Sequence, residues 1–342
     1  MMTRPPRRLN SREDQGRRGS VLVYVVWAVI LLSLFATSVS SRALFALNLA
    51  ERLAGQRQAS YIAQAAIPAA GVVLAQDLSP MVDGANELWA HDPHRFHDYP
   101  MGGGTLRVTP EPIGEDGGAR RYGMADEDQR VNLNTAPAEV LERLLEDVGG
   151  LRPREAAEAA ASIEDWRDPD DDQRPSGAEN FYYRSLRDGY QCKDGPLENA
   201  EELLLVKGVS PEVYARVAPL VTVYGSGRVN LNTAPRPVLR ALGLSDAGVE
   251  GLTAFRAGED NQEQTSDDRT LLSLGGLQSE LERFVPIEDI AKLNTLAGAG
   301  FLGVGSEAFR MFIAAEAGRP QYQVHAMAVI RRQGQVQMWA ER

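Results

Sequence analysis

The sequence RVNLNTAP stands at residues 130–137 and occurs again, without a single change, at residues 228–235. Eight identical residues in two places are far beyond chance, so they indicate an internal duplication or a constraint that acts twice. In each copy Val-Asn-Leu-Asn alternates like a short strand. The following Asn or Thr can cap a helix that the proline helps to begin. Apolar residues at helical spacing follow both copies. The repeat therefore predicts two strand–turn–helix segments.

Further helical pieces lie between the two copies. Residues 154–167 carry alanines, Ile163 and Trp166 at helical spacing, and residues 203–208 lead through Gly208 into another helical pattern from Pro211. Helix, glycine turn and helix together predict helix-hairpin-helix units. Some such hairpins hold a phosphate with backbone amides, but acidic residues surround these turns, which favours a structural role.

The N-terminal region predicts a membrane anchor. No charged residue occurs from Gly19 to Ser41, and six arginines precede this stretch. About 20 apolar residues in a helix span a hydrocarbon core of about 30 Å. The arginines place the N-terminus in the cytoplasm and the bulk of the chain on the other side of the membrane.

Three interpretations of this segment stay open: a cleaved secretory signal, an ordinary single-pass anchor and a prepilin signal. A secretory signal has a shorter apolar region with a small-residue site after it. In the third, the basic leader ends at Gly19 and the apolar run begins at once with Ser20. This order resembles a prepilin signal, which is cut after the glycine so that the apolar run stays on the mature protein.

The segment after the apolar run favours the prepilin interpretation. Residues 42–76 have helix-favouring composition with apolar positions at helical spacing. They predict that the membrane helix continues outside the membrane, for about 45 residues or 70 Å in all. Pro68 is expected to kink this helix or to start a new segment. A long, half-exposed apolar helix leading into a globular head is the plan of a pilin.

Four further segments predict an antiparallel sheet: residues 103–108, 309–314, 322–330 and 336–339, with Gly334 in a turn between the last two. Alternation along residues 322–330 indicates that one face is packed, and the long helix is the expected partner. Because these strands lie before and after the helical region, the chain is expected to leave the sheet and return to it. The fold class is therefore α+β.

Several motifs together resemble the K-class minor pseudopilin family of type II secretion systems. They recur in family order and cover most of residues 17–245: the N-terminus, Asp126–Asp128, both NLNTAP segments, residues 165–168, 177–179 with 182–183, 203–208 and 223–225. The resemblance implies a pilin-like sheet interrupted by a large helical insertion. The expected organisation is a leader at 1–19, the membrane and pilin helix at 20–76, sheet regions at 77–130 and 305–342, and the inserted domain at 131–304.

The resemblance also implies processing and assembly. Cleavage after Gly19 would leave Ser20 as a methylated N-terminus, and Tyr24 would then stand fifth, where most pilins carry a glutamate. That glutamate neutralises a neighbour's amino terminus in the apolar filament core, so a subunit without it suits the tip. The implied partners are the I- and J-class minor pseudopilins, the major pseudopilin, prepilin peptidase and the inner-membrane secretion machinery. The implied location is the bacterial inner membrane, with the bulk periplasmic.

An acidic loop is a candidate calcium site. Asp165, Asp168, Asp170 and Glu179 are the expected ligands, because Ca²⁺ prefers six to eight hard oxygen ligands. The loop does not follow the EF-hand order. Family members bind calcium in the inserted domain, so the resemblance supports the metal. The alternative is a solvated acidic turn.

Other functions receive little support. The net charge of −11 argues against a general nucleic-acid binder, and common catalytic motifs are missing from the sequence, so no enzyme is predicted. His91, His94 and His97 are interpreted as a surface loop, and Cys192 has no evident base. A membrane-anchored helix-hairpin-helix DNA receptor and a minor pilin of a type IV pilus remain alternatives. Ser20, Ile67–Pro68 and residues 245–285 depart from the family pattern.

Overall fold

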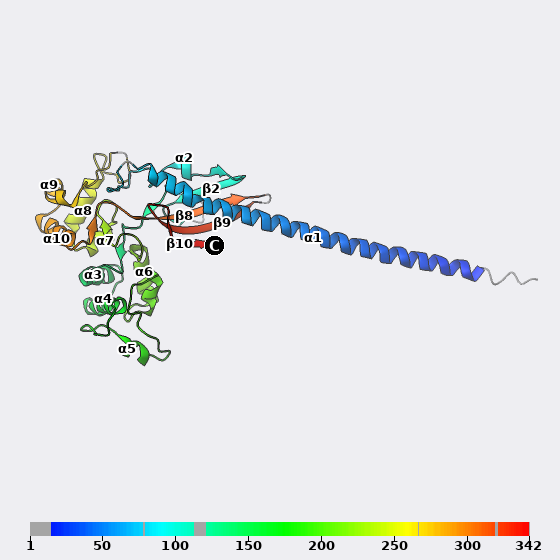
Figure 1. Cartoon of the computed structure of the whole chain (residues 1–342), viewed down its shortest axis with the longest axis horizontal. Helices are drawn as coiled ribbons and strands as arrows, with labels where there is room; N and C mark the ends of the chain where they lie inside the picture. Colours follow the sequence, from blue (N-terminus) through cyan, green and yellow to red (C-terminus); the bar gives the residue numbers. More distant parts are fainter. Residues whose placement is uncertain (1–14, 78, 113–120, 266, 319–320, 342) are drawn as a thin grey trace, which may run out of the picture.

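The computed structural model describes residues 15–77, 79–112, 121–265, 267–318 and 321–341, and for residues 15–20 it describes the backbone alone. One long helix, α1 (Gln15–Ala75), projects from a head that contains the sheet and the remaining helices (Figure 1). The sheet lies along the last part of α1. The other helices gather at the end of α1 that is distant from the N-terminus.

Helix α1 is continuous over 61 residues, which corresponds to about 90 Å. A new segment does not start at Pro68, because the helix runs through this residue to Ala75. Pro68 removes the hydrogen bond to the carbonyl of Gln64. Both residues are exposed, so water can satisfy that carbonyl and the helix continues.

Only the last third of α1 is buried in the head. Its packed face consists of small and aliphatic residues at intervals of three and four: Ala59, Ile62, Ala63, Ala66, Ala70, Val73 and Leu74. The alanines let the helix lie close to the sheet. Contact begins near Gly55, where an added Cβ would lie 2.3 Å from the ring of Tyr322.

The sheet has six strands and is antiparallel. Five of them follow the order β1-β2-β8-β9-β10, and the short β3 also pairs with β8. Their bounds are Tyr99–Met101 (β1), Gly104–Thr109 (β2), Ala125–Asp126 (β3), Ala308–Ala317 (β8), Tyr322–Arg331 (β9) and Val336–Glu341 (β10). The four strands predicted from the sequence are thus confirmed, and β1 and β3 were not predicted.

Alternate residues of the central strands face α1. In β8 these are Phe309, Met311, Ile313, Ala315 and Ala317, all buried in the core that α1 shares with the sheet. The intervening residues of β8 are only partly buried because the other sheet face is more open. The predicted packing of one sheet face on the long helix is confirmed.

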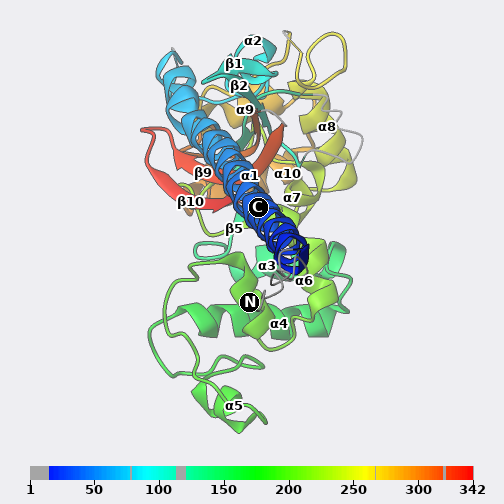
Figure 2. The same ribbon diagram turned by 90° about the vertical axis from the view of Figure 1, so that its right-hand side faces the viewer.

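The chain between β3 and β8 folds into two similar helical units. The first contains β4 (Val131–Asn132), α3 (Ala138–Asp147), α4 (Pro153–Arg167), α5 (Asn180–Ser185), η1 (Ala200–Leu205), α6 (Pro211–Val217), η2 (Ala218–Leu220) and β5 (Val221–Thr222). The second contains β6 (Val229–Asn230), α7 (Arg236–Ala241), α8 (Asp246–Arg256), η3 (Leu274–Gly276), α9 (Leu277–Leu281), α10 (Ile287–Gly298) and β7 (Leu302–Gly303). Figure 2 shows α3–α6 on one side of the head and α7–α10 on the other.

Each unit is closed by a parallel strand pair, β4 with β5 and β6 with β7. In both units the repeat supplies the first strand, and a glycine with positive φ (Gly150 or Gly243) joins the next two helices. One further short helix, α2 (Pro93–Phe96), lies beside β2. Residues 245–285, which match little in the family pattern, contain α8, which is the second unit's counterpart of α4, the loop after it, η3 and α9.

Candidate functional site

The two copies of the repeat are held in the same way. The first Asn of each copy, Asn132 or Asn230, accepts a hydrogen bond from the backbone N–H two residues on, at 2.9 Å and 3.0 Å. The second Asn exchanges two hydrogen bonds with the backbone of one residue: Asn134 with Leu197, and Asn232 with Leu271. The repeated asparagines are therefore connectors within the fold, and three of them are buried while Asn134 is half-buried.

An arginine at the end of a helix holds each copy of the repeat, Arg167 of α4 for the first and Arg256 of α8 for the second. Arg167 donates to the carbonyls of Leu133 and Ala136, and Arg256 donates to the equivalent carbonyls of Leu231 and Ala234. These carbonyls lie just before a helix and have no strand partner. The constraint that fixes the repeat is therefore structural, and it acts once in each unit.

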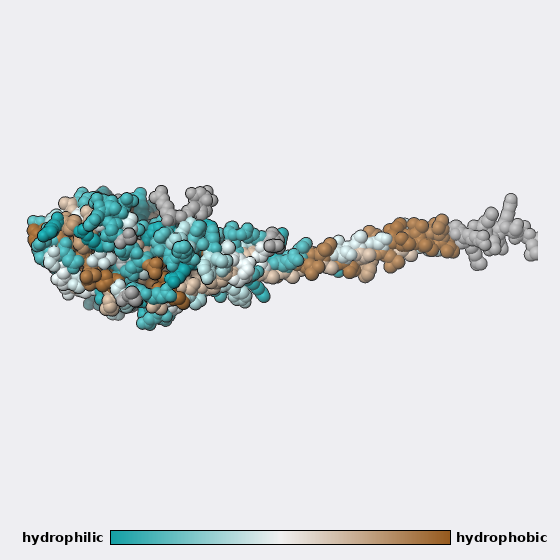
Figure 3. All heavy atoms as spheres, turned by 90° about the horizontal axis from the view of Figure 1, so that it is seen from above, coloured by the Kyte–Doolittle hydropathy of each residue, from teal (hydrophilic) through white to brown (hydrophobic). Residues whose placement is uncertain are grey.

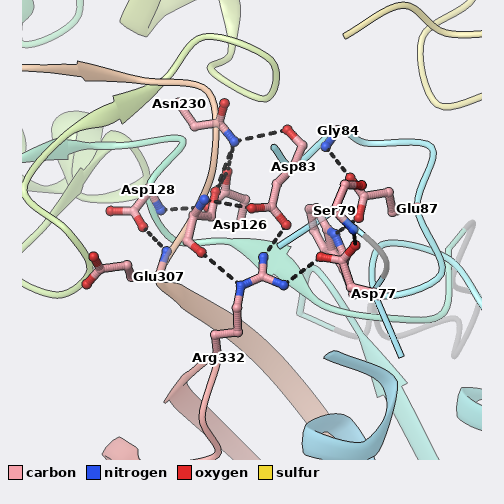
Figure 4. A network of polar contacts seen from close by, with 12 residues as sticks. Asp77, Ser79, Asp83, Gly84, Glu87, Asp126, Asp128, Asn230, Glu307 and Arg332 are labelled. Atoms are coloured by element: carbon pink, nitrogen blue, oxygen red, sulfur yellow. Dashed lines mark hydrogen bonds and ion pairs between the residues drawn. The ribbon is translucent and has the colours of Figure 1, made fainter. Parts of the chain in front are cut away.

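The run Asp126–Asp128 joins the sheet to both units (Figure 4). The Asp126 carboxylate accepts hydrogen bonds from Ser306 at 2.6 Å and Asn230 at 3.0 Å. The Asp128 carboxylate accepts the backbone N–H of Glu307 at 2.7 Å. Both carboxylates thus hold the segment just before β8, and Asp126 also holds the first strand of the second unit.

Asp126 and Asp128 are both buried and are largely shielded from water. Burial raises the pKa of Asp126 to about 6, and burial together with Asp126 raises the pKa of Asp128 to about 7. Nearby, Arg332 donates to Asp77 at 2.7 Å and to Asp83, which ties the turn after β9 to the segment that follows α1 (Figure 4). The network therefore sets the position of the helical units relative to α1.

The exposed part of α1 is the candidate assembly surface. Residues 21–54 are all exposed, and they contain the one helix segment of the described chain that is long and apolar enough to cross a membrane. In Figure 3 the apolar surface is concentrated on this projecting helix. Tyr24, 74% exposed, lies on it.

The processing site is only partly visible. Gly19 and Ser20 lie within α1, where the backbone alone is described, and residues 1–14 of the leader lie outside the described residues. From Val21 to Ser41 the helix carries no carboxylate, so Tyr24 has no acidic substitute nearby. Cleavage after Gly19 stays a prediction.

The acidic loop between α4 and α5 brings together three of its four predicted ligands. Asp168, Asp170 and Glu179 each offer one ligand atom, and these atoms lie within 4.8 Å of one another. Asp165 is buried but is not in this group. It forms an ion pair with Arg174 at 3.0 Å and accepts that residue's backbone N–H. Arg174 also pairs with Asp168, so this one guanidinium is shared between the two carboxylates.

Sequence reasoning missed Asp194. Glu179, Cys192 and Asp194 form a second such group, so Glu179 lies at the centre of both. Asp194 comes from a loop after α5, in a left-handed backbone conformation with φ of 51°. Only folding brings this loop back to the acidic turn, and the spacing of Asp194 in the sequence gave no signal.

Several oxygens of this loop have no hydrogen-bond donor. Both carboxylate oxygens of Glu179, Oδ1 of Asp168 and Oδ1 of Asp194 are buried and unpartnered among the described residues. Burial, followed by the neighbouring carboxylates, raises the pKa of Glu179 to about 7. Buried oxygens without donors are costly, and a hard divalent cation supplies what they lack. The loop therefore fits calcium chemically.

The other polar clusters are less suited to chemistry. Burial raises the pKa of the Cys192 thiol to about 12, and its Sγ donates to the carbonyl of Asp165 at 3.7 Å. His97 stacks on Tyr122 with ring centroids 4.0 Å apart, and His91 stacks on the same ring at 6.4 Å. Within the described part of the chain, no histidine belongs to a cluster that could hold a metal.

The hairpin at Gly208 is packed on protein. Gly208 has φ of 88°, and an added Cβ would lie 3.0 Å from Ala159 on α4. The adjacent cation, Lys207, donates to the carbonyls of Ser176 and Gly177 at 3.1 Å. These contacts support the structural interpretation of the hairpin.

Comparison with known proteins identifies relatives across nearly the whole chain. Residues 122–226 match the family model described as type II secretion system protein K. The chain is 25% identical over 324 residues to a type II secretion system protein K from Klebsiella pneumoniae, covering 93% of each chain. It is 27% identical over 249 residues to the protein of that name from Aeromonas hydrophila, covering 68% of this chain and 73% of the relative.

A solved structure shows the same fold. It is the crystal structure of the GspK-GspI-GspJ complex from the enterotoxigenic Escherichia coli type 2 secretion system. One of its chains matches with a TM-score of 0.59 and 18% identity, over 88% of this chain and 96% of that chain. The fold of the matched part of the chain has therefore already been observed in an assembled complex.

Proposed function

We propose that this chain, which belongs to the type II secretion system protein K family and is a minor pseudopilin, forms the tip of the pseudopilus. It would be anchored in the inner membrane by α1 with the head in the periplasm. There it would nucleate the filament and prevent addition above itself, while subunits are added from below. The secreted proteins would be moved by the filament that grows beneath it.

One observation carries the tip position: the first apolar part of α1 has no carboxylate. A subunit within the filament core would need an acidic group for the amino terminus of its neighbour, because an unpaired charge in an apolar core is costly. From Val21 to Ser41 the helix offers Tyr24 and other uncharged residues only. The helical units at the far end of α1 add bulk where another subunit would stack (Figure 1).

The proposed neighbours are the I- and J-class minor pseudopilins, by analogy with the solved GspK-GspI-GspJ complex. The exposed face of α1 is the surface that would pack against their helices. The major pseudopilin, prepilin peptidase and the inner-membrane secretion machinery are the further partners that this role requires. Processing after Gly19 and methylation of Ser20 belong to the same proposal.

The tip position is tested by locating the head on isolated pseudopili. A gold-conjugated antibody against the head should label one end of each filament and leave the shaft free. The control is an antibody against the major pseudopilin, which should label the shaft. Gold spaced along the shaft would contradict the proposal.

We further propose that the acidic loop binds one structural Ca²⁺. The ligands would be Asp168, Asp170 and Glu179, which form one cluster, and Asp194, which lies near Glu179 in the second cluster. All of them except Asp170 contribute the unpartnered oxygens described above. The ion would neutralise these carboxylates and hold the loop after α4 against the loop after α5. Carboxylate oxygens are the ligands that calcium prefers.

Calcium titration of the full chain in detergent tests this site. Glu179→Gln should weaken Ca²⁺ binding at least tenfold in isothermal titration calorimetry, because Glu179 is common to both clusters. Asp172→Asn is the matched control, since this exposed acid of the same loop is in neither cluster. Equal affinities for the wild type and Glu179→Gln would exclude the site.

A further inference from the structure

A cleft of about 630 Å³ lies where the sheet meets both helical units, and three arginines line it: Arg121, Arg130 and Arg310. Arg121 precedes β3, Arg130 precedes β4, and Arg310 lies in β8. The cleft is within the size range of pockets that bind small ligands. It is separate from the acidic loop and from the exposed part of α1.

Arg121 has no acidic partner in the described part of the chain. Its Nη2 donates to the carbonyls of Ala85 and Ala90, both at 3.2 Å, and its Nε is buried without an acceptor among the described residues. Burial lowers the pKa of this guanidinium. A guanidinium removed from water and left without a carboxylate is costly, and a bound anion would offset that cost.

Arg130 and Arg310 share a single carboxylate. Glu127 is fully buried and accepts from Nη1 of Arg130 through Oε2 and from Nη2 of Arg310 through Oε1, both at 2.5 Å. Nε of Arg310 is buried and has no acceptor within the described ranges. Two guanidinium groups therefore have one negative charge between them, and Arg121 adds a third positive charge.

Asp126 and Glu111 in the cleft, and Asp268 near it, offset part of this positive charge through space, but none of them forms an ion pair with Arg121 in the described part of the chain. Asp126 lines the cleft, but its Oδ2 accepts hydrogen bonds from Ser306, Thr233 and Asn230 and so belongs to the junction of Figure 4. Glu111 also lines the cleft, and in the described part of the chain it forms no ion pair with a basic side chain. No carboxylate of the described chain is thus bound to Arg121.

We propose that this cleft is a binding site for a carboxylate ligand, held by Arg121 and Arg310 with Arg130 beside them. Guanidinium groups bind carboxylates through paired N–H donors, which is the chemistry that the unpartnered Nε atoms leave available. The volume admits a ligand with more than one carboxylate. Two kinds of ligand have this chemistry: a free dicarboxylate and an acidic segment of another protein.

The experiment is isothermal titration of the full chain in detergent, in phosphate-free buffer of low ionic strength. The probes are succinate, an end-blocked tetraglutamate peptide and the matching tetraglutamine peptide. We expect saturable one-to-one binding of succinate or tetraglutamate and none of tetraglutamine. Tighter binding of tetraglutamate would identify a protein segment as the source, and tighter binding of succinate would identify a free dicarboxylate.

Two variants separate the cleft from the general charge of the head. Arg121→Gln should weaken binding of the better probe at least tenfold, and Arg121→Lys should weaken it less because the charge is kept. Arg240→Gln removes the same charge from an exposed position outside the cleft and should change affinity by less than about twofold. Circular dichroism of each variant checks folding.

The absence of saturable binding to the wild type would overturn the proposal. Equal weakening by Arg121→Gln and Arg240→Gln would also overturn it, because long-range charge alone would then explain the affinity. If Arg121→Gln does not fold, Arg310→Gln takes its place with the same expected loss.

Discussion

At the scale of single residues, the chain uses buried polar groups as connectors. Arg256 is the clearest case, because its side chain is 6% exposed and spans from α8 to two carbonyls of the second repeat. Its counterpart, Arg167, does the same in the first unit. A buried cation that donates hydrogen bonds contributes more to the stability of the fold than an exposed one, because its removal leaves carbonyls without donors.

Replacing Arg256 by methionine should therefore destabilise the second unit. We expect a loss of roughly 2–4 kcal/mol in the free energy of unfolding, measured by urea denaturation of the full chain in detergent. Arg240→Met, at a half-exposed position that pairs with an exposed aspartate, is the control and should cost less than about 1 kcal/mol. Equal losses would show that Arg256 does not brace the repeat.

The acids of the junction predict a dependence of stability on pH. Asp126 and Asp128 have pKa values raised to about 6 and about 7, so between about pH 4 and pH 7 the folded state binds more protons than the unfolded state. Stability should then fall as pH rises through this window, by roughly 2–3 kcal/mol between pH 5.5 and pH 7.5.

Urea denaturation at pH 5.5, 6.5 and 7.5 measures this effect. Asp128→Asn removes one of the two groups and should flatten the slope, although the variant is less stable overall because Asp128 accepts from Glu307 and Ser226. Glu87 and Glu179, whose pKa values burial raises to about 7, are present in both proteins and cancel in the comparison. An unchanged slope in the variant would rule out Asp128 as a source.

Some of these residues could be identified from the sequence and others could not. Both repeats were evident, and three of the four acidic ligands proposed from the sequence do lie together, because they share one loop. Asp194 and the partners of Asp126–Asp128 were not predictable, since they come from segments far apart in the chain. Asp165 was grouped with the ligands because nothing in the sequence shows that Arg174 folds back onto it.

At the scale of elements, the interface between α1 and the sheet fixes the position of the head on the long helix. The face that packs is made of alanines and aliphatic residues, and Ala63 within it is fully buried. The next residue, Gln64, is exposed. A large side chain therefore cannot be accommodated at position 63, whereas position 64 can accept one.

Ala63→Leu should strain this interface, whereas Gln64→Leu should not. We expect the first change to cost roughly 1–3 kcal/mol of stability, because the added atoms have no space against the sheet. The second should stay within about 0.5 kcal/mol. Limited proteolysis at increasing urea concentration compares the two. Matching profiles would contradict the packing described here.

The strands and the long helix were predictable because their apolar periodicity is strong. The continuity of α1 at Pro68 was not, since it depends on which side of the helix faces water. The repeat predicted β4 and β6, and the structure confirms them. Their partners β5 and β7 have two residues each, so only pairing in three dimensions defines them. Residues 245–285 could not be interpreted from the sequence. This part of the second unit keeps the order of elements of the first unit but does not resemble it in sequence.

At the scale of the whole molecule, the protein joins a projecting apolar helix to a head widened by two helical units (Figure 1). The duplication explains the width: each unit repeats the same strand, turn and helix pair with its own bracing arginine. The sheet holds α1, and the junction at Asp126–Asp128 holds the units against the sheet. A protein built in this way presents its bulk at the end of α1 distant from the apolar segment.

Assembly at the tip of a pseudopilus depends most directly on how the N-terminus is processed. Mass spectrometry of the protein extracted from membranes, with and without prepilin peptidase, gives the mature terminus. We predict a peptide that begins at methylated Ser20, and its loss when the peptidase is absent. An intact leader in both samples would mean a plain membrane anchor and would contradict assembly at the tip.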